Sequence, residues 1–248
     1  MKNKTVITVA RYLVPLLFWI AVWQLLSLAV NNSYFLPSVG ETFSSLFVLI
    51  RSKYFFKVVL YTLLRVILGL ALGTLLGIIL AFLSNTFTIL RSLITPLMSI
   101  IKSTPVATFI IILWVMMSGD ALAIFIAVLM VMPIIWQNTL DGFNSIDKEL
   151  LEVCTVYEFS SVKKLRILIF PSLKRFLIPA IITSTGLAWK SEIAAEIIAY
   201  TKNSIGQYIN DAKYFFDTSS VFAWTIIIII MSISLEMITK YLLGRCKI

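Results

Sequence analysis

Three charged residues lie close together in a stretch of the chain that is otherwise apolar: Lys190, Glu192 and Glu196. In a helix, Glu192 and Glu196 are four residues apart and share a face with Trp189. A charge at the centre of a membrane-spanning helix costs about 2.5–3.5 kcal/mol on insertion scales, so such a residue normally faces the bundle interior or water. Two carboxylates on one face therefore indicate a wet cavity, a shared proton or a basic partner.

Two functions are open for these charges, a structural ion-pair network and the lining of a translocation pathway. Arg65 and Lys102 are the candidate basic partners from other apolar stretches. Lys190 and Lys102 could also attract an anionic solute, and Thr104, beside the helix-breaking Pro105, is assigned to the same pathway. The predicted pathway residues are Lys102, Thr104, Trp189, Lys190, Glu192 and Glu196.

No catalytic or metal-binding constellation accompanies these charges in the sequence. The chain has no histidine, which removes the commonest metal ligand and the usual general base. It also has no cysteine pair at metal spacing and no Gly-x-Ser-x-Gly elbow. A membrane-embedded enzyme is therefore disfavoured. A stand-alone secondary transporter or channel that uses the charges for coupling remains an alternative, as does a signalling or assembly subunit without cargo.

The composition places these residues in a membrane protein. Hydrophobic residues make up 60% of the 248-residue chain and charged residues 13%, whereas soluble domains are about 45–50% apolar and about 25% charged. The net charge is +9, but the basic residues gather at the ends of apolar stretches, where they set topology and meet anionic lipid headgroups rather than nucleic acid. Both cysteines, Cys154 and Cys246, fall on the predicted cytosolic side, so a disulfide is not expected.

The expected fold class is all-α, a polytopic membrane protein with six transmembrane helices. A span needs about 20 mainly apolar residues. The expected spans are Tyr12–Val30, Val58–Leu83, Ile89–Met117 with a break at Lys102–Pro105, Ala121–Gln137, Phe176–Tyr200 and Ser220–Leu243. A signal peptide competes with the first span, although its tryptophans favour a retained helix.

Smaller features suggest how the spans are arranged. Ser38 and Glu41 form a capping-box pattern, which predicts a short amphipathic helix at the outer interface. Glycines at four-residue spacing (Gly69, Gly73, Gly77) predict close helix packing within one subunit. The bias of basic residues places both termini and the charged loop in the cytosol. We expect an N-terminal part at 1–57 and a core at 58–248 whose charged loop spans about 138–175.

This loop is a charged segment with helical character. Asp147 can cap a helix that begins Lys148-Glu149, and a second, basic helix at Val162–Phe170 is expected to end at Pro171. The helices could present a surface to a cytosolic partner. They could equally form a solvated connector whose lysines lie at lipid headgroups.

The loop resembles the cytosolic loop of bacterial ABC-importer permeases, whose pattern is Glu-Ala-Ala, three residues, Gly, nine residues, then a hydrophobic residue before Leu-Pro. Here Glu152-Val153-Cys154 fills the first triplet, Glu158 stands at the glycine, Leu168 is the hydrophobic residue, and Phe170-Pro171 stands for Leu-Pro. Further matches run from about Leu36 to Trp224 and are similar to the branch that transports nitrate, sulfonates and taurine.

The resemblance implies a non-catalytic subunit in the bacterial inner membrane that forms a dimer, here expected to be a homodimer, within the lipid. It implies a cytosolic ATPase dimer that binds ATP and Mg, so no cofactor is expected in this chain, and a solute-binding protein outside the membrane. The loop helix would dock on the ATPase. The residues expected to dock are Asp147, Glu149, Glu152, Val153, Cys154, Tyr157, Glu158 and Ser161.

Overall fold

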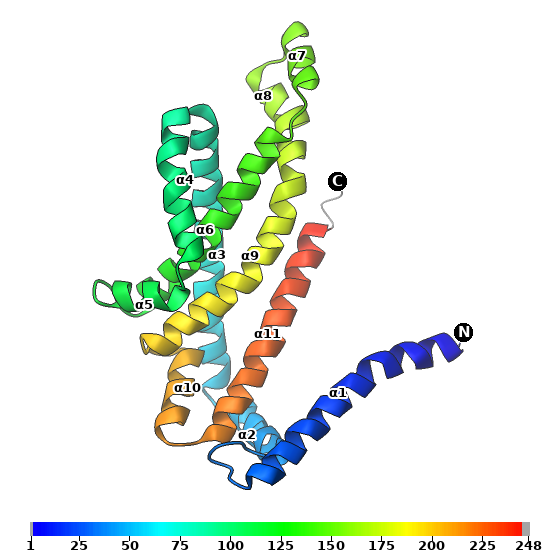
Figure 1. The fold of residues 1–248 in the computed structure, drawn as a ribbon, viewed down its shortest axis with the longest axis vertical. Coiled ribbons are helices and arrows are strands. Elements are labelled where there is room, and N and C mark those ends of the chain that lie inside the picture. Colours follow the sequence, from blue (N-terminus) through cyan, green and yellow to red (C-terminus); the bar gives the residue numbers. More distant parts are fainter. Residues whose placement is uncertain (1, 245–248) are drawn as a thin grey trace. The chain divides into compact units, whose positions relative to one another are not determined.

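The computed structural model describes the backbone of residues 2–244 and the side chains of residues 13–244, so Cys246 lies outside the described residues. Over the described backbone the chain forms helices and no strand (Figure 1). The helices are α1 (Lys2–Val30), α2 (Val39–Arg51), α3 (Phe55–Thr86), α4 (Thr88–Ser103), α5 (Val106–Trp114), α6 (Asp120–Asn144), α7 (Lys148–Val156), α8 (Ser161–Lys164), a π-helical turn (Leu165–Ile169), α9 (Phe170–Ile198), α10 (Ile205–Tyr214) and α11 (Thr218–Gly244).

The chain divides into two compact units. The first comprises Met1–Val58 and Tyr208–Ile229, and the second comprises Val59–Gln207 and Ile230–Ile248. Within the first unit, the indole N–H of Trp23 donates to the Pro37 carbonyl at 3.0 Å, and the Trp23 ring stacks on Phe222 with centroids 5.6 Å apart. These contacts join α1 to the start of α11.

The start of α2 carries the capping box that the sequence predicts. Ser38 accepts a hydrogen bond from the Glu41 N–H, and the Glu41 carboxylate accepts one from the Ser38 N–H. The two residues therefore satisfy donors that the first turn of a helix would otherwise leave unpaired.

In the second unit, glycines let α3 pack closely on α6. A Cβ added at any of three glycines would lie within 2.5–2.8 Å of an α6 side chain, closer than real Cβ atoms come. The pairs are Gly69 with Ala127, Gly73 with Val131, and Gly77 with Ile135. The prediction that these glycines serve packing within one subunit is confirmed.

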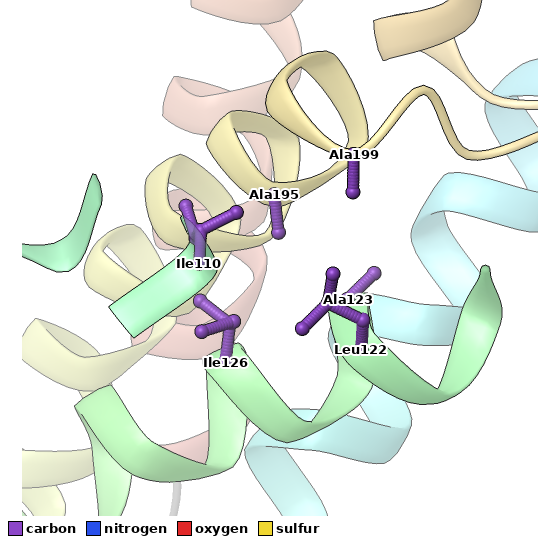
Figure 2. Packing of buried hydrophobic residues seen from close by; sticks show 6 residues of the cluster. All are labelled: Ile110, Leu122, Ala123, Ile126, Ala195 and Ala199. Carbon is purple, nitrogen blue, oxygen red and sulfur yellow. The ribbon is translucent and has the colours of Figure 1, made fainter. Parts of the chain in front are cut away.

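A buried apolar cluster joins α5, α6 and α9 (Figure 2). It contains Ile110, Leu122, Ala123, Ile126, Ala195 and Ala199. The small alanines of the α9 side leave room for the branched side chains opposite, so α9 can approach α6. The cluster adjoins the end of α9 that carries Glu192 and Glu196, and so helps to hold that end in place.

The prediction of an all-α polytopic membrane protein is confirmed. Four described helices are long and apolar enough to cross a membrane, namely α1 (through Leu13–Val30), α3, α6 and α11. The pair α4 and α5, bent by 101° at the predicted break, is a further candidate. Helix α9 falls outside this set, and it carries Lys174, Arg175, Lys190, Glu192 and Glu196. The expected number of six spans therefore stays a prediction.

One predicted boundary is wrong. The basic helix of the loop does not end at Pro171, because helical backbone continues from Ser161 through the π-helical turn into α9. Pro171 lies directly after the π-helical turn, in which the Phe170 N–H donates to the Leu165 carbonyl. The wider π-helical turn before it gives the proline ring room that a regular α-turn would not provide. Helix α9 thus begins at Phe170, before the residue at which the fifth span is expected to start, and the start of that span stays a prediction.

Candidate functional site

The Glu196 carboxylate is the centre of a buried polar cluster in the second unit. Its side chain is fully buried and accepts hydrogen bonds from the Arg65 guanidinium at 2.7 Å, the Thr62 hydroxyl at 2.9 Å and the Gly206 N–H at 3.2 Å. A Cβ at Gly206 would overlap Glu196, so only glycine lets the backbone approach this closely. The buried Glu196 carboxylate, in the last turn of α9, thus has both a counter-charge and hydrogen-bond donors.

Arg65 links this cluster to other elements. Its Nε donates to Asp120 at the start of α6 at 3.0 Å, and its Nη2 donates to the Lys202 carbonyl at 3.1 Å. The Arg65 side chain is almost fully buried, whereas the Asp120 side chain is 66% exposed. One guanidinium therefore fastens α3 to α6, to α9 and to the segment after α9. Of the two predicted basic partners, Arg65 pairs with Glu196, while Lys102 is exposed in the last turn of α4.

Glu192 lies one turn before Glu196 and is also fully buried. Neither of its carboxylate oxygens has a hydrogen-bond partner within the described residues. Trp189, one turn earlier on the same face, is buried as well. This face of α9 is therefore buried within the protein at Trp189, Glu192 and Glu196. Of the two predicted roles, the structural ion-pair network matches the geometry at Glu196, which pairs with Arg65. The assignment of these residues to a pathway stays a prediction.

Lys190 points to a different environment. It lines an open cavity of about 480 Å³ together with Glu236 and Lys240 of α11. Ile182 and Leu187 of α9 supply apolar wall. Glu236 and Lys240 were not predicted as site residues from the sequence. A signal was present, because Glu236 is a carboxylate inside an apolar stretch, as Glu192 is, and Lys240 follows it four residues later.

The break between α4 and α5 has a simple local cause. Thr104 caps α4, its hydroxyl donates to the Ile100 carbonyl at 2.8 Å, and Pro105 then begins the turn into α5. Lys102 and Thr104 therefore lie at a bend of 101°, at which the chain turns through slightly more than a right angle.

The expected docking helix is present as α7. Asp147 caps it by accepting from the Glu149 N–H at 2.9 Å, as predicted. At its end, the Phe159 N–H donates to the Cys154 carbonyl and the Glu158 N–H to the Thr155 carbonyl. This pattern is a Schellman motif whose left-handed position is Glu158, with φ of +47°. The residue that stands at the glycine of the family pattern thus adopts the backbone conformation that favours glycine.

Most of the surface of α7 and its flanks faces solvent. Val153, Val156 and Tyr157 are exposed, Val156 by 79%. The acidic side chains at Glu149, Glu152 and Glu158 are exposed too, as are Asp147 and Ser161, whereas Cys154 is buried. Figure 1 shows α7 and α8 at one end of the α6 and α9 pair.

Comparisons with known proteins define the class. A family model for binding-protein-dependent transport system inner membrane components matches residues 73–247. The chain belongs to this family, and it is therefore an ABC-importer permease, a multi-pass protein of the bacterial inner membrane. It is also 27% identical over 211 residues to SsuC of Bacillus subtilis (strain 168), described as a putative aliphatic sulfonates transport permease protein. That match covers 84% of this chain and 76% of SsuC.

Proposed function

We propose that this chain is the non-catalytic, membrane-spanning subunit of an ATP-driven importer for a small anionic, sulfonate-like solute. Two copies would form the membrane dimer, with an ATPase dimer bound in the cytosol and a solute-binding protein outside. ATP and Mg belong to the ATPase in this proposal. The observation that carries it is helix α7, a capped helix with an exposed apolar and acidic surface at the end of the α6 and α9 pair.

The exposed side chains of α7 suit a partner whose surface is both apolar and basic. Val153, Val156 and Tyr157 expose apolar area beside the carboxylates of Glu152 and Glu158. In this proposal α7 lies in the cytosol and these side chains form one contiguous patch, and contiguous exposed apolar patches mark interaction sites. An ATPase groove with an apolar floor and basic rim would fit this surface. Closure of the ATPase pair on ATP would then move α7, and with it the α6 and α9 pair, between two arrangements.

The solute class rests on two observations. The relative SsuC is described as a permease for aliphatic sulfonates. In this chain, Lys190 and Lys240 place two ammonium groups on one open cavity, which suits an oxyanion. The bend at Thr104 and Pro105 is the second predicted part of the pathway, since irregular backbone within a membrane is tolerated where it lines a cavity or is buried in protein.

The test is purification of the tagged chain from its host in mild detergent, with identification of every accompanying protein by mass spectrometry. The preparation is repeated with Glu152→Lys and Glu158→Lys combined, and with Lys213→Glu, at an exposed position of α10, as a charge-reversal control. Recovery of an ATPase with the unmodified chain and the control, but not with the double variant, would support the proposal. Recovery of no ATPase from the unmodified chain would contradict it and favour a stand-alone transporter.

A further inference from the structure

The buried face of α9 holds two carboxyl groups, Glu192 and Glu196, and both are fully shielded from solvent. The charged neighbours of Glu192 are Glu196 on the same helix, Arg65 on α3 and Asp120 at the start of α6. All of them belong to the second unit of the chain. Arg65 already pairs with both Glu196 and Asp120. Within the described part of the chain, no second cation pairs with Glu192.

The remaining elements around this part of α9 supply no counter-charge either. Helix α5, which shares the apolar cluster with α9, has no charged residue. Lys202, in the segment after α9, is exposed and offers its carbonyl to Arg65. On α11, the carboxylate of Glu236 lies against Gly186, earlier in α9. A negative charge on Glu192 would therefore be buried without a cation of its own, which costs far more than burial of the neutral acid.

The hydrogen bonding of Glu192 leads to the same conclusion. Neither of its oxygens meets a donor among the described residues, although its side chain lies within hydrogen-bonding reach of the Glu196 carboxyl group. Two carboxylates can only accept hydrogen bonds, whereas a protonated carboxyl group has one O–H to donate. One proton on Glu192 would supply this donor and remove the repulsion between the two groups. Glu196 is the member of the pair that stays ionised, because it is bound to Arg65.

We propose that Glu192 is a buried proton-binding site, a neutral carboxylic acid that donates its proton to the Glu196 carboxylate in a hydrogen bond. A glutamate in water is ionised at neutral pH, since its ordinary pKa is about 4.3. If α9 separates from α3 and α6 and this face meets water, Glu192 therefore releases one proton to the solvent. The site couples the packing of α9 to proton binding, so acid favours the packed arrangement. The inference does not depend on the proposed import function.

The first experiment is infrared difference spectroscopy at neutral pH on the full chain, purified with the proteins that accompany it in an alkyl maltoside detergent. The spectrum of the unmodified chain minus that of Glu192→Gln should contain the C=O stretching band of a protonated carboxyl group. The glutamine N–H can still donate to Glu196, so the packing should be preserved. Glu192→Leu removes the same carboxyl group and serves if the glutamine variant is not recovered. Asp217→Asn, the control, removes an exposed carboxylate and keeps a cap for α11, so its difference spectrum should lack this band.

The second measurement is the melting temperature of the same preparations between about pH 6 and pH 8. The folded chain holds one proton more than the unfolded chain at Glu192, so this residue makes stability fall as the pH rises. The fall should be shallower in Glu192→Gln, which has no proton to lose. It should be unchanged in Asp217→Asn, because an exposed aspartate is ionised over this whole range.

The band together with the shallower fall in Glu192→Gln would support the proposal. A difference spectrum that contains carboxylate bands instead would show that Glu192 is ionised, and would overturn it. Equal pH dependence in the unmodified chain and in Glu192→Gln would overturn it as well, since no proton would then be lost from Glu192 on unfolding. Each result holds with or without an accompanying ATPase, so failure of the proton site and failure of the importer are separate outcomes.

Discussion

The Arg65 guanidinium and the Glu196 carboxylate meet at 2.7 Å in the interior of the second unit, and both side chains are almost completely shielded from solvent. Helix α3 supplies the arginine and α9 the glutamate. The pair fixes the two helices at a defined register, because Glu196 would be left as an uncompensated buried charge without Arg65. Thr62 and Gly206 complete the shell around the carboxylate.

Replacing Arg65 with Gln should therefore destabilise the protein strongly. Breaking a buried pair by removal of one partner costs about 3–5 kcal/mol, because the remaining charge stays buried. The melting temperature of the purified protein in detergent, followed by intrinsic tryptophan fluorescence, measures this loss. Lys102→Gln removes a charge from an exposed position in α4 and should leave the melting temperature nearly unchanged.

A double-mutant cycle tests whether the loss belongs to the pair. Glu196→Gln in the Arg65→Gln background should cost less than it does alone, since no charge is then left unpaired between these two residues. Strictly additive losses would show that Arg65 acts through Asp120 and the Lys202 carbonyl rather than through Glu196.

The glycine face of α3 makes a second prediction. Gly73→Val should lower the melting temperature, because its Cβ would lie 2.8 Å from the Val131 Cβ and overpacking costs about 1–3 kcal/mol. Val131→Ala in the same chain should restore part of the loss by removing the opposing methyl groups. Gly244→Ala, which meets nothing within 4 Å at the end of α11, is the control. A loss that Val131→Ala does not reduce would contradict this packing.

Several of these features follow from the sequence because they depend on short-range chemistry. The capping box at Ser38 and Glu41, the cap at Asp147 and the break before Pro105 each involve residues within a few positions of one another. The sequence also predicted that α3 packs closely on a neighbouring helix, since a spacing of four residues puts glycines such as Gly73 on one face. It did not predict that this neighbour is α6, because the spacing does not say what packs on that face.

The cavity was harder to predict for a similar reason. Lys190 could be singled out in its own helix, but its position on one cavity with Glu236 and Lys240 depends on how α9 and α11 pack, which local patterns do not encode. Pro171 misled the prediction in the opposite direction. A proline usually stops or kinks a helix, but here a π-helical turn lies directly before it and the helical backbone continues.

The capping box at α2 should respond to acid. Hydrogen bonds from the Ser38 N–H, the Ser33 hydroxyl and the Ser38 hydroxyl lower the pKa of Glu41 below its ordinary value. The folded-state pKa is thus below the unfolded one, so the stabilisation is present above the unfolded value, about 4.3, and is lost as the pH falls through the folded value. Amide hydrogen exchange at the start of α2, corrected for intrinsic rates, should accelerate over this range. Glu41→Gln should abolish that pH dependence, and persistence of the dependence in this variant would assign it to another group.

Glu158 offers a way to separate the shape of the proposed docking loop from its contacts. Its φ of +47° costs a residue with a side chain about 1–2 kcal/mol, a strain that glycine escapes. Glu158→Gly should therefore keep the Schellman motif after α7 and slow hydrogen exchange of the Phe159 amide, which bonds to the Cys154 carbonyl. Glu158→Val should speed that exchange, because a β-branched residue resists this conformation. If Glu158→Gly retains the ATPase in the copurification as fully as the unmodified chain does, the residue contributes backbone geometry. If that variant loses the ATPase while the Phe159 amide stays protected, the carboxylate itself contacts the partner.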